Sequence, residues 1–141
     1  MKFDAKNEIA DIKEYITERV ANYSNAQKVK MIEFGFQFDQ GGIFCVFFDT
    51  RKDAAPDGTW TMKLDGNCLE RTHWPEVCES YEEDEFAEML GNLIRNTVLE
   101  LRDCGLFNSL NKYKNCEIGI EEMNGFYGWP NYEDRGKENL A

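Results

Sequence analysis

The stretch that decides the fold begins KMIEFGFQFDQGGIFCVFF, residues 30–48, and continues to Leu64. Apolar residues alternate with polar or small ones from Ile32 to Phe38, the pattern of a strand with one buried face. Asp39-Gln40-Gly41-Gly42 is typical of a tight turn, because glycine adopts positive φ without strain. Ile43–Phe48 is apolar on both faces, as in a central strand covered on both sides. These residues predict a β-hairpin at the centre of the fold.

Two further strands are expected beyond the hairpin. Thr59–Leu64 alternates apolar and polar residues after Pro56-Asp57-Gly58, in which proline presets φ and glycine takes the left-handed position. Cys116–Glu121 alternates in the same way nearer the C-terminus. We therefore predict a mainly antiparallel sheet of about four strands.

Two amphipathic helices are expected to pack on this sheet. The first follows an N-cap at Asp4 and ends near Asn22, with an apolar stripe at spacings of three and four and with charged residues, Glu8 among them, mostly off that stripe. The second is predicted from a capping box, Ser80 to Glu83, as far as Gly105, where glycine commonly ends a helix. Residues 67–79 are expected to be irregular, because proline interrupts regular helix.

The expected element order is α-β-β-β-α-β in a single α+β domain covering residues 1–141. A chain of 141 residues is near the commonest domain size and can bury a core without disulfides or metals. No shift of composition marks a domain boundary, and the tail from about residue 132 is expected to be flexible.

The charge of the chain disfavours some classes of partner. The 16 Lys and Arg residues stand against 27 Asp and Glu, for a formal net charge of −11. Such a field repels the phosphates of nucleic acids and of anionic membrane surfaces. No apolar run reaches the roughly 20 residues of a membrane-spanning helix. A basic protein partner, by contrast, would be attracted and its association accelerated.

The cysteines and the N-terminus indicate a cytoplasmic protein with free thiols. The cysteines number five, an odd count, and no two of them form a Cys-x-x-Cys pair. The first eight residues have none of the apolar core that a secretory signal peptide needs.

Cys68, His73 and Cys78 have the most metal-like spacing in the chain. It matches the last three ligands of a zinc knuckle, whose first cysteine would fall at Asp65, and glutamates flank it where a nucleic-acid-binding knuckle is basic. The same histidine could activate the thiol of Cys68 or Cys78 as a nucleophile. A small zinc-binding structural domain and a small enzyme are therefore alternatives to the simpler interpretation, a surface histidine beside two half-buried thiols.

An acidic run in residues 79–88 is the densest charge feature. Acids in the first turn of a helix stabilise it by about 0.3–1 kcal/mol each, but the five acids in residues 79–85 exceed what a helix start requires. Asp49, at the end of the second strand of the hairpin, and Asp53 and Asp57, in the loop that follows it, would add to this negative charge. We predict a partner-binding surface at these carboxylates: Asp49, Asp53, Asp57, Glu79, Glu82, Glu83, Asp84 and Glu85.

The segments Phe48-Asp49-Thr50-Arg51, Pro56-Asp57-Gly58-Thr59-Trp60 and Leu69-Glu70-Arg71-Thr72-His73-Trp74-Pro75 resemble small bacterial proteins. Some of those are similar to immunity proteins of polymorphic or contact-dependent toxin systems. The resemblance spans residues 30–80 and includes no catalytic signature. It implies a single cytoplasmic domain that binds and blocks a cognate toxin, often a basic nuclease. We therefore expect a non-enzymatic module without a cofactor, whose carboxylates occlude a basic active site.

Overall fold

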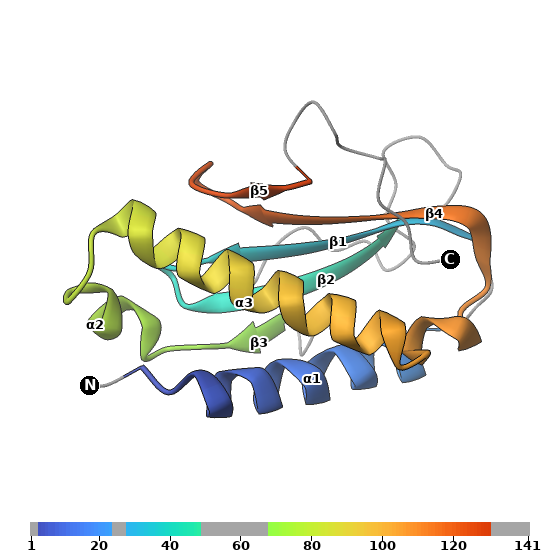
Figure 1. The fold of residues 1–141 in the computed structure, drawn as a ribbon, viewed down its shortest axis with the longest axis horizontal. Helices are drawn as coiled ribbons and strands as arrows, with labels where there is room; N and C mark the ends of the chain where they lie inside the picture. The colour runs from blue at the N-terminus through green and yellow to red at the C-terminus, as the bar shows by residue number, and fades with distance from the viewer. Residues whose placement is uncertain (1–2, 24–27, 49–67, 131–141) are drawn as a thin grey trace.

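One mixed sheet carries two long helices on a single face, in a computed structural model that describes residues 3–23, 28–48 and 68–130 (Figure 1). The strands lie in the order β3-β2-β1-β4-β5. Their bounds are Val29–Gln37 for β1, Gly42–Phe48 for β2, Cys68–Glu70 for β3, Lys112–Glu122 for β4 and Gly128–Trp129 for β5. The helices are α1 Ala5–Asn22, α2 Trp74–Cys78, α3 Glu83–Asp103 and a short 3-10 helix, η1, Leu106–Ser109. The predicted α+β class is confirmed.

The hairpin of β1 and β2 forms as predicted. Its antiparallel register runs from Met31 opposite Phe48 to Gln37 opposite Gly42. Gly41 in the turn has a φ of 77°, so the glycine takes the positive φ that the turn needs. The Gly41 carbonyl also accepts a hydrogen bond of 2.6 Å from the Arg71 N–H, which binds the turn to the chain after β3.

The centre of the sheet is a parallel pair. Ile32 of β1 lies beside Ile118 of β4 and Phe34 beside Ile120, whereas the other three pairings in the described residues are antiparallel. The sheet is therefore mainly antiparallel, as predicted, with five described strands instead of about four. The predicted strand Thr59–Leu64 and the tail from residue 132 lie outside the described residues.

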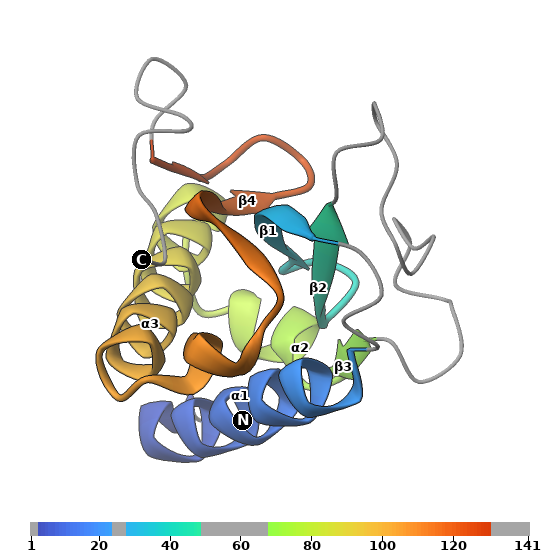
Figure 2. The same cartoon turned by 90° about the vertical axis from the view of Figure 1, so that its right-hand side faces the viewer.

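Helices α1 and α3 pack against each other on the same side of the sheet (Figure 2). Asp4 caps α1 as predicted, because its Oδ1 accepts from the N–H groups of Lys6 and Asn7 at 3.1 and 3.3 Å. Helix α3 ends before Gly105, whose φ of 87° confirms the predicted glycine stop. The buried residues that α1 and α3 contribute to the core include Ile12, Ile16, Val20, Phe86, Leu90, Ile94 and Val98.

The prediction of an irregular segment between residues 67 and 79 is wrong. Strand β3 extends the sheet next to β2, and α2 follows it. Pro75 is compatible with α2 because it occupies the first turn, where the missing N–H would have no helical partner.

The predicted capping box is also wrong. Helix α3 begins at Glu83 with Glu82 as N-cap, and no side chain caps it. Ser80 is instead part of the turn that continues from α2, where its N–H donates to the carbonyl of Val77 at 3.1 Å. The residue is thus held by the preceding helix and is two positions too early to cap α3.

Two side chains of α1 bind the backbone of β2 just beyond its short pairing with β3. The hydroxyl of Tyr15 accepts from the N–H of Cys45 at 3.0 Å, and Nη2 of Arg19 donates to the Cys45 carbonyl at 2.7 Å. The last residue of β2 paired with β3 is Phe44. Polar groups of α1 therefore satisfy both backbone groups of Cys45. Among the described residues no helix is both long and apolar enough to cross a membrane.

Candidate functional site

The structure places the predicted acidic surface at one end of the molecule. Glu79 follows α2, and Glu82, Glu83, Asp84 and Glu85 lie at the start of α3, all of them exposed. This end is at the left of Figure 1, where α2 and the start of α3 lie near the turn between β1 and β2. The other three predicted carboxylates, Asp49, Asp53 and Asp57, lie outside the described residues.

These acidic side chains do little for the fold itself. Within the described part of the chain, Asp84 is the one member of the five whose side chain makes a hydrogen bond, and its Oδ1 accepts from the N–H of Glu85 at 2.9 Å. The acids at the start of α3 complement its dipole, but Glu79 belongs to the turn before that helix. The sequence between Glu76 and Glu88 contains no lysine or arginine. Among the described residues, no ion pair joins these five carboxylates to a cation, so they form an exposed negative surface.

A second charged cluster joins α1 to the segment between β3 and α2. Nη2 of Arg71 lies 2.7 Å from Oε2 of Glu8, and its Nη1 lies 2.8 Å from Oδ2 of Asp11. The other carboxylate oxygen of Glu8, Oε1, contacts Nε2 of His73. Glu8 is 2% exposed and Arg71 is 9% exposed, so the pair is shielded from solvent. This cluster is a buried tie between two segments far apart in the sequence.

The cluster corrects two expectations. Glu8 was expected mostly off the apolar stripe of α1, but it is buried, because Arg71 compensates its charge in the interior and His73 contacts its other carboxylate oxygen. His73 was expected at the surface, but it is partly buried against Glu8. The signal for Glu8 was present in the sequence, since it stands four residues before Ile12 and so in line with the buried face of the helix.

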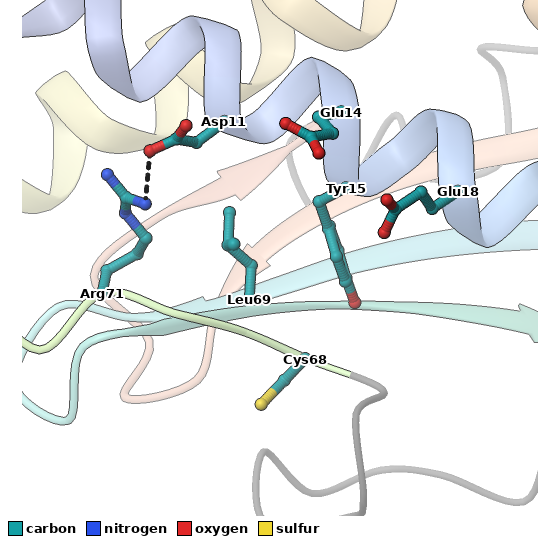
Figure 3. Close-up of a pocket in the computed structure, with 7 residues that line it drawn as sticks. All are labelled: Asp11, Glu14, Tyr15, Glu18, Cys68, Leu69 and Arg71. Atoms are coloured by element: carbon teal, nitrogen blue, oxygen red, sulfur yellow. Dashed lines mark hydrogen bonds and ion pairs between the residues drawn. The ribbon is translucent and has the colours of Figure 1, made fainter.

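Arg71 also borders a hollow of about 300 Å³ beside α1 (Figure 3). In this view Asp11 turns toward Arg71, whereas Cys68 points away from the helix. The hollow is lined by Asp11, Glu14, Tyr15, Glu18, Cys68, Leu69 and Arg71. Because Arg71 is occupied by two carboxylates, the hollow presents no uncompensated cation to an anionic ligand.

The geometry gives no support to nucleophilic catalysis by Cys68 or Cys78. Burial raises the pKa of the Cys68 thiol, and the nearby Glu70 raises it further. Burial also raises the pKa of the Cys78 thiol, together with the neighbouring carboxylates Glu83, Asp39 and Glu79. A catalytic thiol needs the opposite environment, one that favours the thiolate. The histidine expected to act as base is engaged with a carboxylate of α1.

Among the described residues, Cys68, His73 and Cys78 are not brought together as metal ligands. Within residues 3–23, 28–48 and 68–130, no group of three or more His, Cys, Asp and Glu side chains is arranged to hold a metal ion. The reason is that Cys68 begins β3, His73 turns to Glu8, and Cys78 ends α2. The knuckle-like spacing is therefore divided between a strand and a helix.

Comparisons of the chain with protein-family models, with curated protein sequences and with solved structures found no match.

Proposed function

We propose that this protein is a non-enzymatic binding module for a basic protein, of the kind represented by immunity proteins that neutralise a toxin domain. The observation that carries the proposal is the exposed acidic surface at the start of α3, formed by Glu79, Glu82, Glu83, Asp84 and Glu85. The formal net charge of −11 adds a long-range field of the same sign. The resemblance of residues 30–80 to immunity proteins points in the same direction.

Electrostatics would govern how such a complex forms. Exposed carboxylates stay hydrated in the unbound protein and meet arginine and lysine side chains at the interface. In a nuclease toxin those cations bind substrate phosphates, so carboxylates at the same positions would exclude the substrate. Charge attraction raises the association rate and makes it fall as salt is added.

Co-expression with the protein encoded by the neighbouring gene tests the proposal. Cells that express that protein should survive when this chain is present, and the two should co-purify. A pair of substitutions, Glu82→Gln with Glu85→Gln, should slow association by about tenfold at low salt, because rim charges act chiefly on the association rate. The matched control is Glu14→Gln with Glu18→Gln, which removes the same charge from the exposed side of α1. Failure of the wild-type chain to protect or to bind would refute the proposal.

A further inference from the structure

A groove opens between the β1–β2 turn and the segment that joins α2 to α3. Its volume is about 330 Å³. Its walls combine rings, a thiol and carboxylates: Phe38, Asp39, Pro75, Cys78, Glu79, Tyr81 and Glu83. Two of these, Glu79 and Glu83, belong to the acidic surface described above, so groove and surface are continuous.

One exposed apolar side chain lines this groove, and a second packs on a residue of its wall. Among the described residues, the large hydrophobic side chains that are exposed are Tyr81 at 40%, Met123 at 36% and Phe126 at 43%. Tyr81 lines the groove directly, and Phe126 packs edge-on against Phe38 of the groove wall, with ring centroids 5.3 Å apart. The N–H of Met123 bonds the carbonyl of Phe36, two residues before Phe38. Apolar surface gathered in one place is typical of an interaction site.

The groove is built on fixed elements. Asp39 accepts a hydrogen bond of 3.0 Å from Nδ2 of Asn124, whose own N–H donates to Oε1 of the buried Glu122 at 2.7 Å. On the opposite wall, Tyr81 stacks on Phe86 of α3 with ring centroids 5.3 Å apart. Both walls are therefore held before any partner arrives, which lowers the entropy lost on binding.

We propose that this groove receives an apolar or aromatic side chain of the basic partner, flanked in the partner by arginine or lysine. This proposal rests on the proposed function: the groove would supply the contact that gives the complex with the basic partner its affinity. An acidic surface alone would need no exposed rings, and an apolar groove alone would need no carboxylates. The groove and the carboxylates together fit a partner with one buried apolar anchor and cationic residues beside it. Those cations can pair with Asp39, Glu79 and Glu83 and stack on Tyr81.

A second copy of this chain fits the groove less well. Each copy would bring a net charge of −11 and its own exposed carboxylates toward those of the other. Like charges brought together at an interface oppose association, whereas a cationic partner gains from the same field. Charge complementarity therefore selects a basic occupant.

The test uses the full chain, labelled with ¹⁵N, and the peptide acetyl-Arg-Trp-Arg-amide as the probe. Titration should shift the amide signals of Phe38, Tyr81 and Glu83 above all others. The peptides acetyl-Arg-Ala-Arg-amide and acetyl-Glu-Trp-Glu-amide should bind at least about fivefold more weakly, since one lacks the anchor and the other the cations. Shifts centred elsewhere, or equal binding of the three peptides, would overturn the inference.

Variants locate the contact independently of the partner. Tyr81→Ala should weaken binding of the Arg-Trp-Arg peptide by about fivefold, and Phe126→Ala, a second variant at the groove, should do the same. The spectrum of each free variant verifies that it is folded. Glu79→Gln with Glu83→Gln should also weaken binding, whereas Glu14→Gln with Glu18→Gln should leave it unchanged. An unliganded dimer in sedimentation that Tyr81→Ala and Phe126→Ala convert to monomer would show that a second copy occupies the groove, against the inference.

The outcomes separate the two proposals. Specific peptide binding in the groove without protection in the co-expression experiment would refute the toxin partner and leave the basic-anchor groove in place. Protection that is unaffected by Tyr81→Ala and Phe126→Ala would support the proposed function and refute the groove as its contact.

Discussion

Oε2 of Glu8 lies 2.7 Å from Nη2 of Arg71 in an ion pair that is almost wholly buried. The pair joins the first helix to the segment that leads from β3 into α2. Arg71 also binds the β1–β2 turn through its backbone, because its N–H donates to the Gly41 carbonyl. The position of the turn, and with it one wall of the groove, thus depends on a contact made by α1.

Breaking this ion pair should destabilise the fold strongly. Glu8→Gln leaves the buried guanidinium of Arg71 with Asp11 as its remaining carboxylate, and the loss of one interaction with a charged group typically costs about 1.5–3 kcal/mol. Urea denaturation measures the change in the free energy of unfolding. The control is Glu100→Gln, which breaks the exposed pair of Lys13 and Glu100 and should cost less than about 1 kcal/mol. Equal costs for the two variants would contradict a structural role for the buried pair.

Gly91 should resist replacement by alanine, although alanine normally stabilises a helix by about 1 kcal/mol relative to glycine. A Cβ at Gly91 would lie 2.5 Å from the ring of Tyr127, whose hydroxyl is held by Asn92 Oδ1 at 3.0 Å. We expect Gly91→Ala to lower the melting temperature in the wild-type background. In a Tyr127→Ala background the same change should be neutral or stabilising, because the obstructing ring is gone. A loss of the same size in both backgrounds would exclude steric conflict with Tyr127 as the cause.

Tyr15 should make the fold less stable at high pH. Burial raises the pKa of its hydroxyl above the ordinary value near 10, so the unfolded chain loses this proton at a lower pH than the folded one. The stability that the protonated Tyr15 hydroxyl contributes is complete below the pKa of tyrosine in the unfolded chain. It declines as the pH rises above that pKa, by at most about 1.4 kcal/mol per pH unit. Denaturation between about pH 9 and 11 should show a steeper decline for wild type than for Tyr15→Phe. Parallel declines would contradict the assignment.

The same Tyr15→Phe variant should also be less stable at neutral pH. It removes the buried hydrogen bond of 3.0 Å from the N–H of Cys45 to the Tyr15 hydroxyl, and loss of such a bond typically costs about 0.5–1.5 kcal/mol. Thr17→Val is a suitable control, because it removes a hydroxyl that bonds within the exposed side of the same helix.

The five cysteines should react with a thiol reagent at very different rates. Cys104 is exposed and should react first, whereas Cys45 and Cys116 are 1% and 0% exposed and should react only when the protein unfolds. Burial also raises the pKa of the Cys116 thiol to about 12, which leaves almost no thiolate at neutral pH. Cys104→Ser should abolish the fastest phase in a stopped-flow assay with dithiobisnitrobenzoate. A fast phase that persists in this variant would contradict the assignment.

Local sequence patterns determined much of the fold. Period-two alternation and the glycine turn indicated the hairpin of β1 and β2, and helical spacing indicated α1 and α3. The N-cap of α1 and the glycine stop of α3 were also readable, because each depends on residues within one turn of the helix end. The acidic surface at the start of α3 could be predicted from the charged residues of that segment alone.

Only the tertiary structure decided how these elements meet. The parallel pairing of β1 with β4, the burial of Glu8 and the groove between Phe38 and Tyr81 each join residues distant in the chain. Periodicity shows which face of a segment is buried but carries no information about the segment that covers it. A charged residue such as Glu8 can occupy the buried face only where the fold supplies its cation, so its role follows from Arg71, sixty-three residues later.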